Sequence, residues 1–244
     1  MIKKGIILAG GHGTRMSPLT KAVNKQLLPI YDKPLIFYPL SILMLAKIKD
    51  ILIIVNKGQL NQYKKILPDG KNLGIKITYK EQIYPRGLPE AFILGEKFIN
   101  KDNVALILGD NFFYGQSLTD QLQKNTKLKK GARIVLHKVN KPELYGVAKV
   151  NNKNKVTLIK EKPRKYISDL AITGLYFFDN SVVKFAKELK PSKVPISNIS
   201  KNDLFLLKER LEKITSCSEL ISLSLDLKSR SFFMSVNFLI PSSL

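Results

Sequence analysis

The sequence predicts an α/β fold: a mixed, mainly parallel sheet flanked by helices. Residues 4–9 form a continuous apolar run, which is typical of a strand buried on both faces of a parallel sheet. A helical pattern over 34–46 and a β-branched run over 50–55 follow, so the order is strand, helix, strand. The chain has 244 residues, 44% of them hydrophobic, which is enough for one sizeable domain or two small ones.

The remaining elements continue this alternation. Further strands are expected over 75–79, 104–108, 132–137, 146–150 and 174–178, and further helices over 89–98 and 118–125. Alternating strands and helices favour an open α/β sheet over separate all-α and all-β units.

The charge balance is strongly basic but does not indicate a nucleic-acid partner. The chain carries 41 Lys and Arg against 19 Asp and Glu, a formal charge of +22. Lysines dominate and are spread along the chain, without aromatic interleaving, a helix-turn-helix pattern or a zinc finger. We therefore expect no nucleic acid; a lysine-rich background composition accounts for most of the charge, and phosphate-bearing substrates add a little.

The compartment expected from the sequence is the cytoplasm. Cys217 is the only cysteine, so an intramolecular disulfide framework is excluded. The first apolar run is too short for a signal-peptide core, and no stretch approaches the roughly 18 apolar residues of a membrane helix. No membrane partner is expected.

Composition changes sharply after Gly174. All 14 glycines lie at or before that residue, and 175–244 becomes rich in serine and leucine. Tight turns and close backbone approaches favour glycine. We expect the α/β domain to span 1–193 and a divergent segment to span 194–244, for which poor order is one expectation.

A glycine-rich loop follows the first strand and is suited to phosphate. Gly10, Gly11 and Gly13 let backbone N–H groups approach a phosphate chain, and Arg15 adds a cationic fork. The spacing is not Gly-x-Gly-x-x-Gly, and no Gly-Lys-Ser/Thr closes the loop. The dinucleotide fingerprint and the P-loop are both excluded.

A carboxylate lies where another strand is expected to end. Asp110 follows the apolar run 104–108, and ligand sites in open α/β sheets gather at such carboxyl ends. A metal ligand is the favoured interpretation, and an N-cap of the next helix is the competing one.

Five ordered motifs carry a resemblance to a known family. They are 10–20 with 25–34; Gln82 with Gly87, Leu88 and Phe92; 108–115; 143–147; and 161–163 with 171–176. Over about residues 3–192 the chain resembles the sugar-1-phosphate nucleotidylyltransferases, and the Lys-Gln-Leu-Leu-Pro wording at 25–29 is similar to the glucose-1-phosphate thymidylyltransferases among them. The resemblance implies a Rossmann-like nucleotidyltransferase fold.

The resemblance also implies a reaction and its catalytic residues. It implies transfer of a thymidylyl group from dTTP to glucose-1-phosphate, giving pyrophosphate and dTDP-glucose for deoxysugar (dTDP-rhamnose) and surface polysaccharide biosynthesis. Arg15 and Lys25 would hold the triphosphate, Lys162 would hold the sugar phosphate, and Asp110 would bind Mg²⁺ as cofactor.

Two sets of binding residues are implied in the same way. The nucleotide set is Leu8, Gly10, Gly11, Gly13, Thr14, Arg15, Gln26, Gln82 and Gly87, with Gln82 and Gly87 at the base. The sugar set is Tyr145, Gly146, Glu161, Lys162 and Thr173.

The C-terminal part departs from the family pattern. The family has a second metal-binding aspartate in a stretch that contains tryptophan, whereas this chain has no tryptophan, and Asp226 is only a weak substitute. Family chains continue with helices that help subunits associate, so a homo-oligomer is expected in weakened form. Truncation or a frame-shifted reading of the tail is the hypothesis that explains the change.

Departures near the base leave alternatives open. Arg86 stands where Asp is common and Glu90 where Gln is frequent. The alternatives are an enzyme that uses UTP or another sugar-1-phosphate, and an inactive nucleotide-binding remnant.

Overall fold

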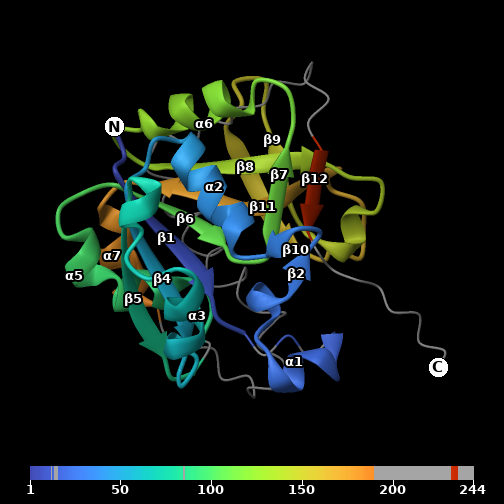
Figure 1. Cartoon of the computed structure of the whole chain (residues 1–244). Coiled ribbons are helices and arrows are strands. Elements are labelled where there is room, and N and C mark those ends of the chain that lie inside the picture. Colours follow the sequence, from blue (N-terminus) through green and yellow to red (C-terminus); the bar gives the residue numbers. More distant parts are fainter. Residues whose placement is uncertain (12, 14–15, 85, 190–231, 236–244) are drawn as a thin grey trace.

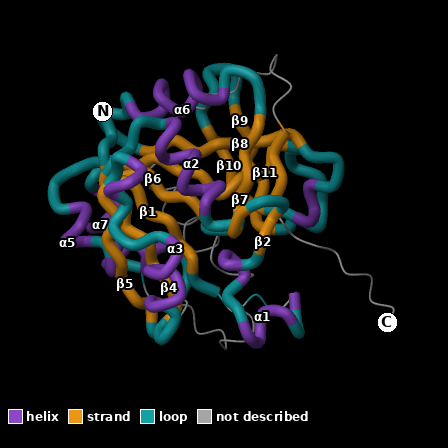
Figure 2. Tube along the Cα trace, viewed as in Figure 1, coloured by secondary structure: helices purple, strands orange, loops and turns teal. Residues whose placement is uncertain are grey.

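The fold is an open α/β sheet with helices on both faces, as the sequence predicts (Figures 1 and 2). The computed structural model describes residues 1–11, 13, 16–84, 86–189 and, as a main-chain strand, 232–235. The expected boundary at 193/194 lies outside these residues. The main sheet has eight strands in this part of the chain, in the order β10-β9-β11-β6-β1-β4-β5, with β8 also paired to β11.

Half of this sheet is parallel. β1 (Lys4–Ala9) pairs in parallel with β4 (Asp50–Asn56) and with β6 (Val104–Leu108), and β4 pairs in parallel with β5 (Lys76–Gln82). β1 and β4 are joined through α2 (Phe37–Leu45), which confirms the expected strand-helix-strand unit. The carboxyl ends of all four strands therefore lie at one edge of the sheet.

The other half is antiparallel. β11 (Leu170–Phe178) runs against β6, β8 (Ala132–Lys138) and β9 (Gly146–Val150), and β10 (Val156–Glu161) runs against β9. The sequence located β8 and β9 but predicted only the second half of β11.

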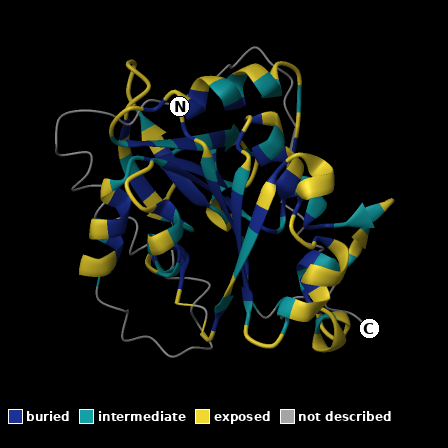
Figure 3. Cartoon of the chain, turned by 60° about the vertical axis from the view of Figure 1, so that its left-hand side comes forward, coloured by how far each residue is buried: buried dark blue, intermediate teal, exposed yellow. Residues whose placement is uncertain are grey.

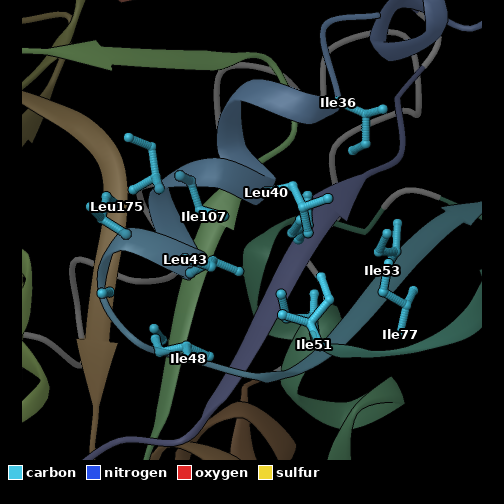
Figure 4. Packing of buried hydrophobic residues seen from close by; sticks show 14 of the residues in the cluster. Ile36, Leu40, Leu43, Ile48, Ile51, Ile53, Ile77, Ile107 and Leu175 are labelled. Carbon is cyan, nitrogen blue, oxygen red and sulfur yellow. The ribbon is translucent and has the colours of Figure 1, made fainter. Parts of the chain in front are cut away.

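Each face of the sheet buries its own apolar cluster (Figure 3). On β4, Ile51 and Ile53 enter one cluster and Leu52 and Ile54 the other, the period-two alternation of a strand covered on both faces. Figure 4 shows Leu40 and Leu43 of α2 over Ile51 and Ile107 in the first cluster. The other cluster packs the sheet against α4 (Leu88–Leu94) and α7 (Ser181–Glu188).

Smaller elements connect these layers. They are α1 (Leu19–Ala22), η2 (Lys25–Leu27), β2 (Pro29–Ile30), β3 (Lys33–Pro34), α3 (Leu60–Ile66), η3 (Lys71–Leu73), α5 (Glu96–Ile99), β7 (Asn111–Tyr114), α6 (Leu118–Thr126), η4 (Pro142–Leu144) and β12 (Phe232–Ser235). The single helix expected over 89–98 is wrong in one respect: it is two helices, α4 and α5, that meet at Gly95. β12 pairs antiparallel with β7. The helices of the described ranges include none with the length and hydropathy needed to cross a membrane.

Gly174 adapts β11 to the end of β6. Its backbone has φ +81°, and the pairing of β11 with β8 shifts register between Ile172 and Tyr176. A Cβ here would overlap the Asn111 side-chain nitrogen and lie 2.7 Å from Leu108 Cδ1. That nitrogen donates to the Thr173 carbonyl oxygen, so the irregularity in β11 holds the residue after Asp110 in place.

Gly174→Ala is expected to lower the free energy of unfolding by about 2 to 5 kcal/mol, because the methyl group meets both left-handed backbone strain and occupied space. Gly74→Ala is the matched control, since Gly74 has φ +67° with nothing within 4 Å of an added Cβ. It should cost only about 1 to 2 kcal/mol. Urea unfolding measures both, and equal losses would contradict the packing role of Gly174.

Candidate functional site

The predicted nucleotide residues gather at the carboxyl edge of the parallel strands. Gly10 follows β1, Asn56 ends β4, Gln82 ends β5, and Asp110 lies two residues after β6. β4 and β5 lie on one side of β1, and β6 lies on the other. Ligands of open α/β sheets bind where connections diverge in this way, so the region beyond the carboxyl ends of β1 and β6, called the crevice below, is the candidate site.

The glycine loop is held by the end of the neighbouring strand. Asn56 accepts from the Gly11 N–H through Oδ1 at 3.1 Å and donates from Nδ2 to the Gly11 carbonyl oxygen at 3.0 Å. The Gly13 carbonyl oxygen accepts from Thr20 Oγ1 at 2.8 Å. Asn56 was not among the predicted residues; its place at the end of a parallel strand was the signal that could have identified it. Thr14 and Arg15 lie outside the described residues.

Gln82 reaches from β5 across to Gly10. A Cβ on Gly10 would overlap Gln82 Oε1, so the absence of a side chain there lets the amide lie against the start of the loop. Gln82 is 2% exposed, and its Nε2 donates to Glu90 Oε2 at 2.6 Å. Gly87 precedes the first residue of α4 as its N-cap. The structure therefore groups Gln82 and Gly87 around one helix start.

Lys25 and Asp110 form an ion pair in the crevice. Lys25 Nζ lies 2.9 Å from Asp110 Oδ2, and the two side chains are 11% and 28% exposed. Asp110 leads into β7, and the next helix, α6, has Ser117 as its N-cap, so the competing N-cap interpretation of Asp110 is wrong. The two residues are 85 positions apart in the sequence. The fold thus brings the lysine predicted to bind phosphate into contact with the aspartate predicted to bind the metal.

A buried polar cluster positions Lys25. The side chain of Asn24, the N-cap of η2, accepts from the Gln26 N–H at 3.0 Å and from the Tyr63 hydroxyl at 3.0 Å. Tyr63 of α3 is fully buried, and this burial raises the pKa of its hydroxyl, so it remains a neutral donor. The lysine is therefore held by the packed body of the fold.

Gln26 and Leu8 contact the loops that follow β1 and β6. Gln26 is 4% exposed; its Nε2 donates to the Gly10 carbonyl oxygen at 3.5 Å, a long hydrogen bond. Its Oε1 is buried without a hydrogen-bond partner among the described residues. The Leu8 carbonyl oxygen accepts from the Gly109 N–H at 2.9 Å, which ties the two loops together.

The predicted sugar residues lie on the antiparallel half of the sheet. Glu161 is paired with Gly146 across β10 and β9, and the Lys162 N–H donates to the Tyr145 carbonyl oxygen at 2.9 Å. Lys162 adopts φ +40° as the chain leaves β10. Thr173 is buried and donates from Oγ1 to the Val135 carbonyl oxygen at 2.8 Å. The structure therefore brings these five residues to three adjacent strands.

Glu161 is a carboxylate short of partners. Its Oε2 is buried and has no hydrogen-bond partner in the part of the chain that is described. Burial raises the pKa of this carboxyl, and the nearby charge of Lys162 opposes the rise. The pKa of the Tyr176 hydroxyl is raised, first by burial and then by the charge of Glu161. An oxygen acceptor kept from water in this way is suited to a ligand hydroxyl.

The acidic residues fit a metal that takes most of its ligands from substrate. No group of three or more His, Cys, Asp or Glu that could hold a metal occurs within the described ranges, and Asp226 lies outside them. Mg²⁺ is commonly held by one or two carboxylates together with phosphates and water. Asp110 at the mouth of the crevice is suited to that arrangement.

Comparison with known proteins agrees with this geometry. A sequence profile of the nucleotidyl transferase family matches residues 4–212. A glucose-1-phosphate thymidylyltransferase of Neisseria meningitidis is 53% identical over 189 residues, which cover 78% of this chain and 66% of the relative. The chain thus spans slightly less than two thirds of the length of that relative.

Solved structures share the fold. A Bacillus anthracis protein assigned as a glucose-1-phosphate thymidylyltransferase, in complex with sucrose, is 38% identical with a TM-score of 0.72 and covers 83% of this chain and 82% of its own. A UDP-glucose pyrophosphorylase complexed with UDP-glucose is 26% identical with a TM-score of 0.73 and covers 87% and 88%. With a family profile over most of its length and the same sheet, this chain belongs to the nucleotidyl transferase family.

Proposed function

We propose that this chain transfers a thymidylyl group from dTTP to glucose-1-phosphate and releases pyrophosphate and dTDP-glucose. The observation that carries the proposal is the convergence of Gly10, Lys25, Gln82 and Asp110 at one edge of the sheet, whose other half includes β10 with Glu161 and the adjoining Lys162. A relative that matches 78% of the chain at 53% identity is named for this activity.

The chemistry needs charge stabilisation rather than a covalent intermediate. An oxygen of the sugar phosphate attacks the α-phosphorus, the bond from that phosphorus to the bridging oxygen breaks, and pyrophosphate leaves. Because both reactants and the transition state are anionic, fixed cations and backbone N–H groups supply most of what the protein can contribute.

In this scheme each half of the sheet supplies one reactant's contacts. Lys25 and the loop that begins at Gly10 hold the triphosphate, together with Arg15. Lys162 holds the attacking phosphate. Glu161 accepts a hydrogen bond from a sugar hydroxyl, which would provide its buried oxygen with the partner it lacks.

A divalent cation completes the proposal. Mg²⁺ at Asp110 would neutralise charge on the phosphates and orient them for in-line attack. The Asp110 carboxylate already pairs with the Lys25 ammonium, which shows that its oxygens are accessible to a positively charged group.

Use of UTP is the second candidate. It is favoured by the similarity to a UDP-glucose pyrophosphorylase over 87% of the chain, and by the exposed Arg86 next to the base residues. dTTP and UTP differ in the thymine methyl group and in the 2′-hydroxyl of the ribose, so selection between them depends on the space and the polar groups around both positions.

Incubation with Mg²⁺, glucose-1-phosphate and either dTTP or UTP is expected to release pyrophosphate, with a higher kcat/KM for dTTP. A coupled pyrophosphate assay measures both rates. A higher kcat/KM for UTP would replace the first proposal with the second. Binding of dTTP without any release would instead indicate an inactive nucleotide-binding protein.

Lys25→Met should lower kcat/KM by about a hundredfold or more, because it removes a fixed cation from the developing charge. Lys21→Met is the matched control: Lys21 lies on α1 and is exposed. It should change kcat/KM less than about twofold. Similar losses in the two variants would refute a specific role for Lys25.

Glu161→Gln should separate stability from function. Because the pKa of the wild-type carboxyl is higher in the folded state than in the unfolded state, this group contributes stability that is fully present below its unfolded pKa. That contribution is lost as pH rises through the folded pKa. The variant should therefore match the wild type in Tm near pH 3.5 and exceed it near pH 7.5, while its KM for glucose-1-phosphate rises by about tenfold. A variant less stable than the wild type near pH 7.5 would contradict this assignment.

A further inference from the structure

The amide of Gln82 has one of its ends fixed by a carboxylate. Its Nε2 donates to Glu90 Oε2 at 2.6 Å, while Oε1 lies where it would overlap a side chain at Gly10. Gln82 is almost fully buried, so the amide has little freedom to exchange this bond for water. The nitrogen end thus faces α4, and the oxygen end faces the glycine loop.

Glu90 is itself anchored. The same Oε2 accepts from the Arg86 backbone N–H at 2.8 Å, and the Glu90 N–H donates to the Gly87 carbonyl oxygen at 3.2 Å. Glu90 lies in the first turn of α4, where a carboxylate is favoured by the helix dipole and can reach back to a free N–H. Its position therefore does not depend on Gln82.

This anchorage decides which way the amide points. An ionised carboxylate accepts hydrogen bonds and donates none, so only the NH₂ group of Gln82 can face it. Rotating the amide by half a turn would place its oxygen against the carboxylate and leave both without a donor. Glu90 consequently holds Oε1 toward the crevice as an acceptor.

Bases differ in what they offer to such an acceptor. Thymine and uracil carry an imide N–H between two carbonyl groups, whereas cytosine has an unprotonated ring nitrogen at that position. We propose that Glu90 fixes the polarity of the Gln82 amide and so makes the site select an imide-bearing pyrimidine over cytosine. Glu90 is a positioning residue that acts through Gln82, and the inference rests on the proposed function because it requires the base to lie at Gln82.

Equilibrium binding of dTTP and dCTP in Mg²⁺, without sugar phosphate, tests the proposal. Wild type should bind dTTP on the order of tenfold to a hundredfold more tightly than dCTP. Glu90→Ala and Glu90→Met both remove the acceptor, and the second keeps a long side chain and high helix propensity. Each should reduce the dTTP/dCTP ratio by about tenfold, because the released amide can present either end.

Two further variants separate this role from a general effect on the helix. Glu90→Gln keeps an oxygen that can accept from both Gln82 and Arg86, so it should retain most of the wild-type ratio. Glu96→Ala removes the acidic first-turn residue of α5 and its ion pair with Lys187, away from Gln82, and should leave the ratio unchanged.

These measurements test the positioning role of Glu90 separately from the proposed function. A wild-type ratio retained in Glu90→Met, or lost equally in Glu90→Gln, overturns the positioning role and leaves nucleotide binding intact. Equal wild-type binding of dTTP and dCTP also overturns it alone. A wild type that binds neither nucleotide overturns the proposed function and the inference together.

Discussion

The site depends on the double pairing of β6. This strand is parallel to β1 on one side and antiparallel to β11 on the other, so it joins the parallel half of the sheet, which carries the proposed nucleotide residues, to the antiparallel half, which carries the proposed sugar residues. Its carboxyl end leads directly to Asp110, and the residue after it bonds to the β11 backbone at Thr173. Because both halves share one strand, the distance between the two proposed substrates is set by sheet geometry rather than by loops.

The parallel half could be predicted because its strands are buried on both faces. Such strands are continuous β-branched runs, and β1 and β6 begin and end where the sequence indicated. β10 was missed, since its exposed Thr157 and Lys160 interrupt any apolar run. α3 was missed because Tyr63 is its only buried residue and packs on Asn24, a contact that no local pattern encodes.

Motifs predicted candidate site residues but not how these residues contact one another. The resemblance named Lys25 and Asp110 for separate roles, and it took the fold to show them as an ion pair. Asn56 belongs to none of the motifs, yet it makes two hydrogen bonds to the loop. Such partners are chosen by strand order, which the residues of a single motif do not specify. The Arg15, Thr14 and Asp226 assignments fall outside the described residues and stay predictions.

Polar atoms left without partners concentrate where a ligand is expected. Among the described residues, buried side-chain atoms lacking a hydrogen bond occur in Gln26, Glu161 and Arg133, and the first two belong to the predicted site. Native interiors satisfy nearly all such groups, because each unpaired one costs about 1 to 3 kcal/mol. A sheet buried on both faces can tolerate that cost, and a substrate that supplies the missing donors recovers it on binding. The fold thus holds these acceptors in place without a ligand, which is the preorganisation that the proposed nucleotidyl transfer would use.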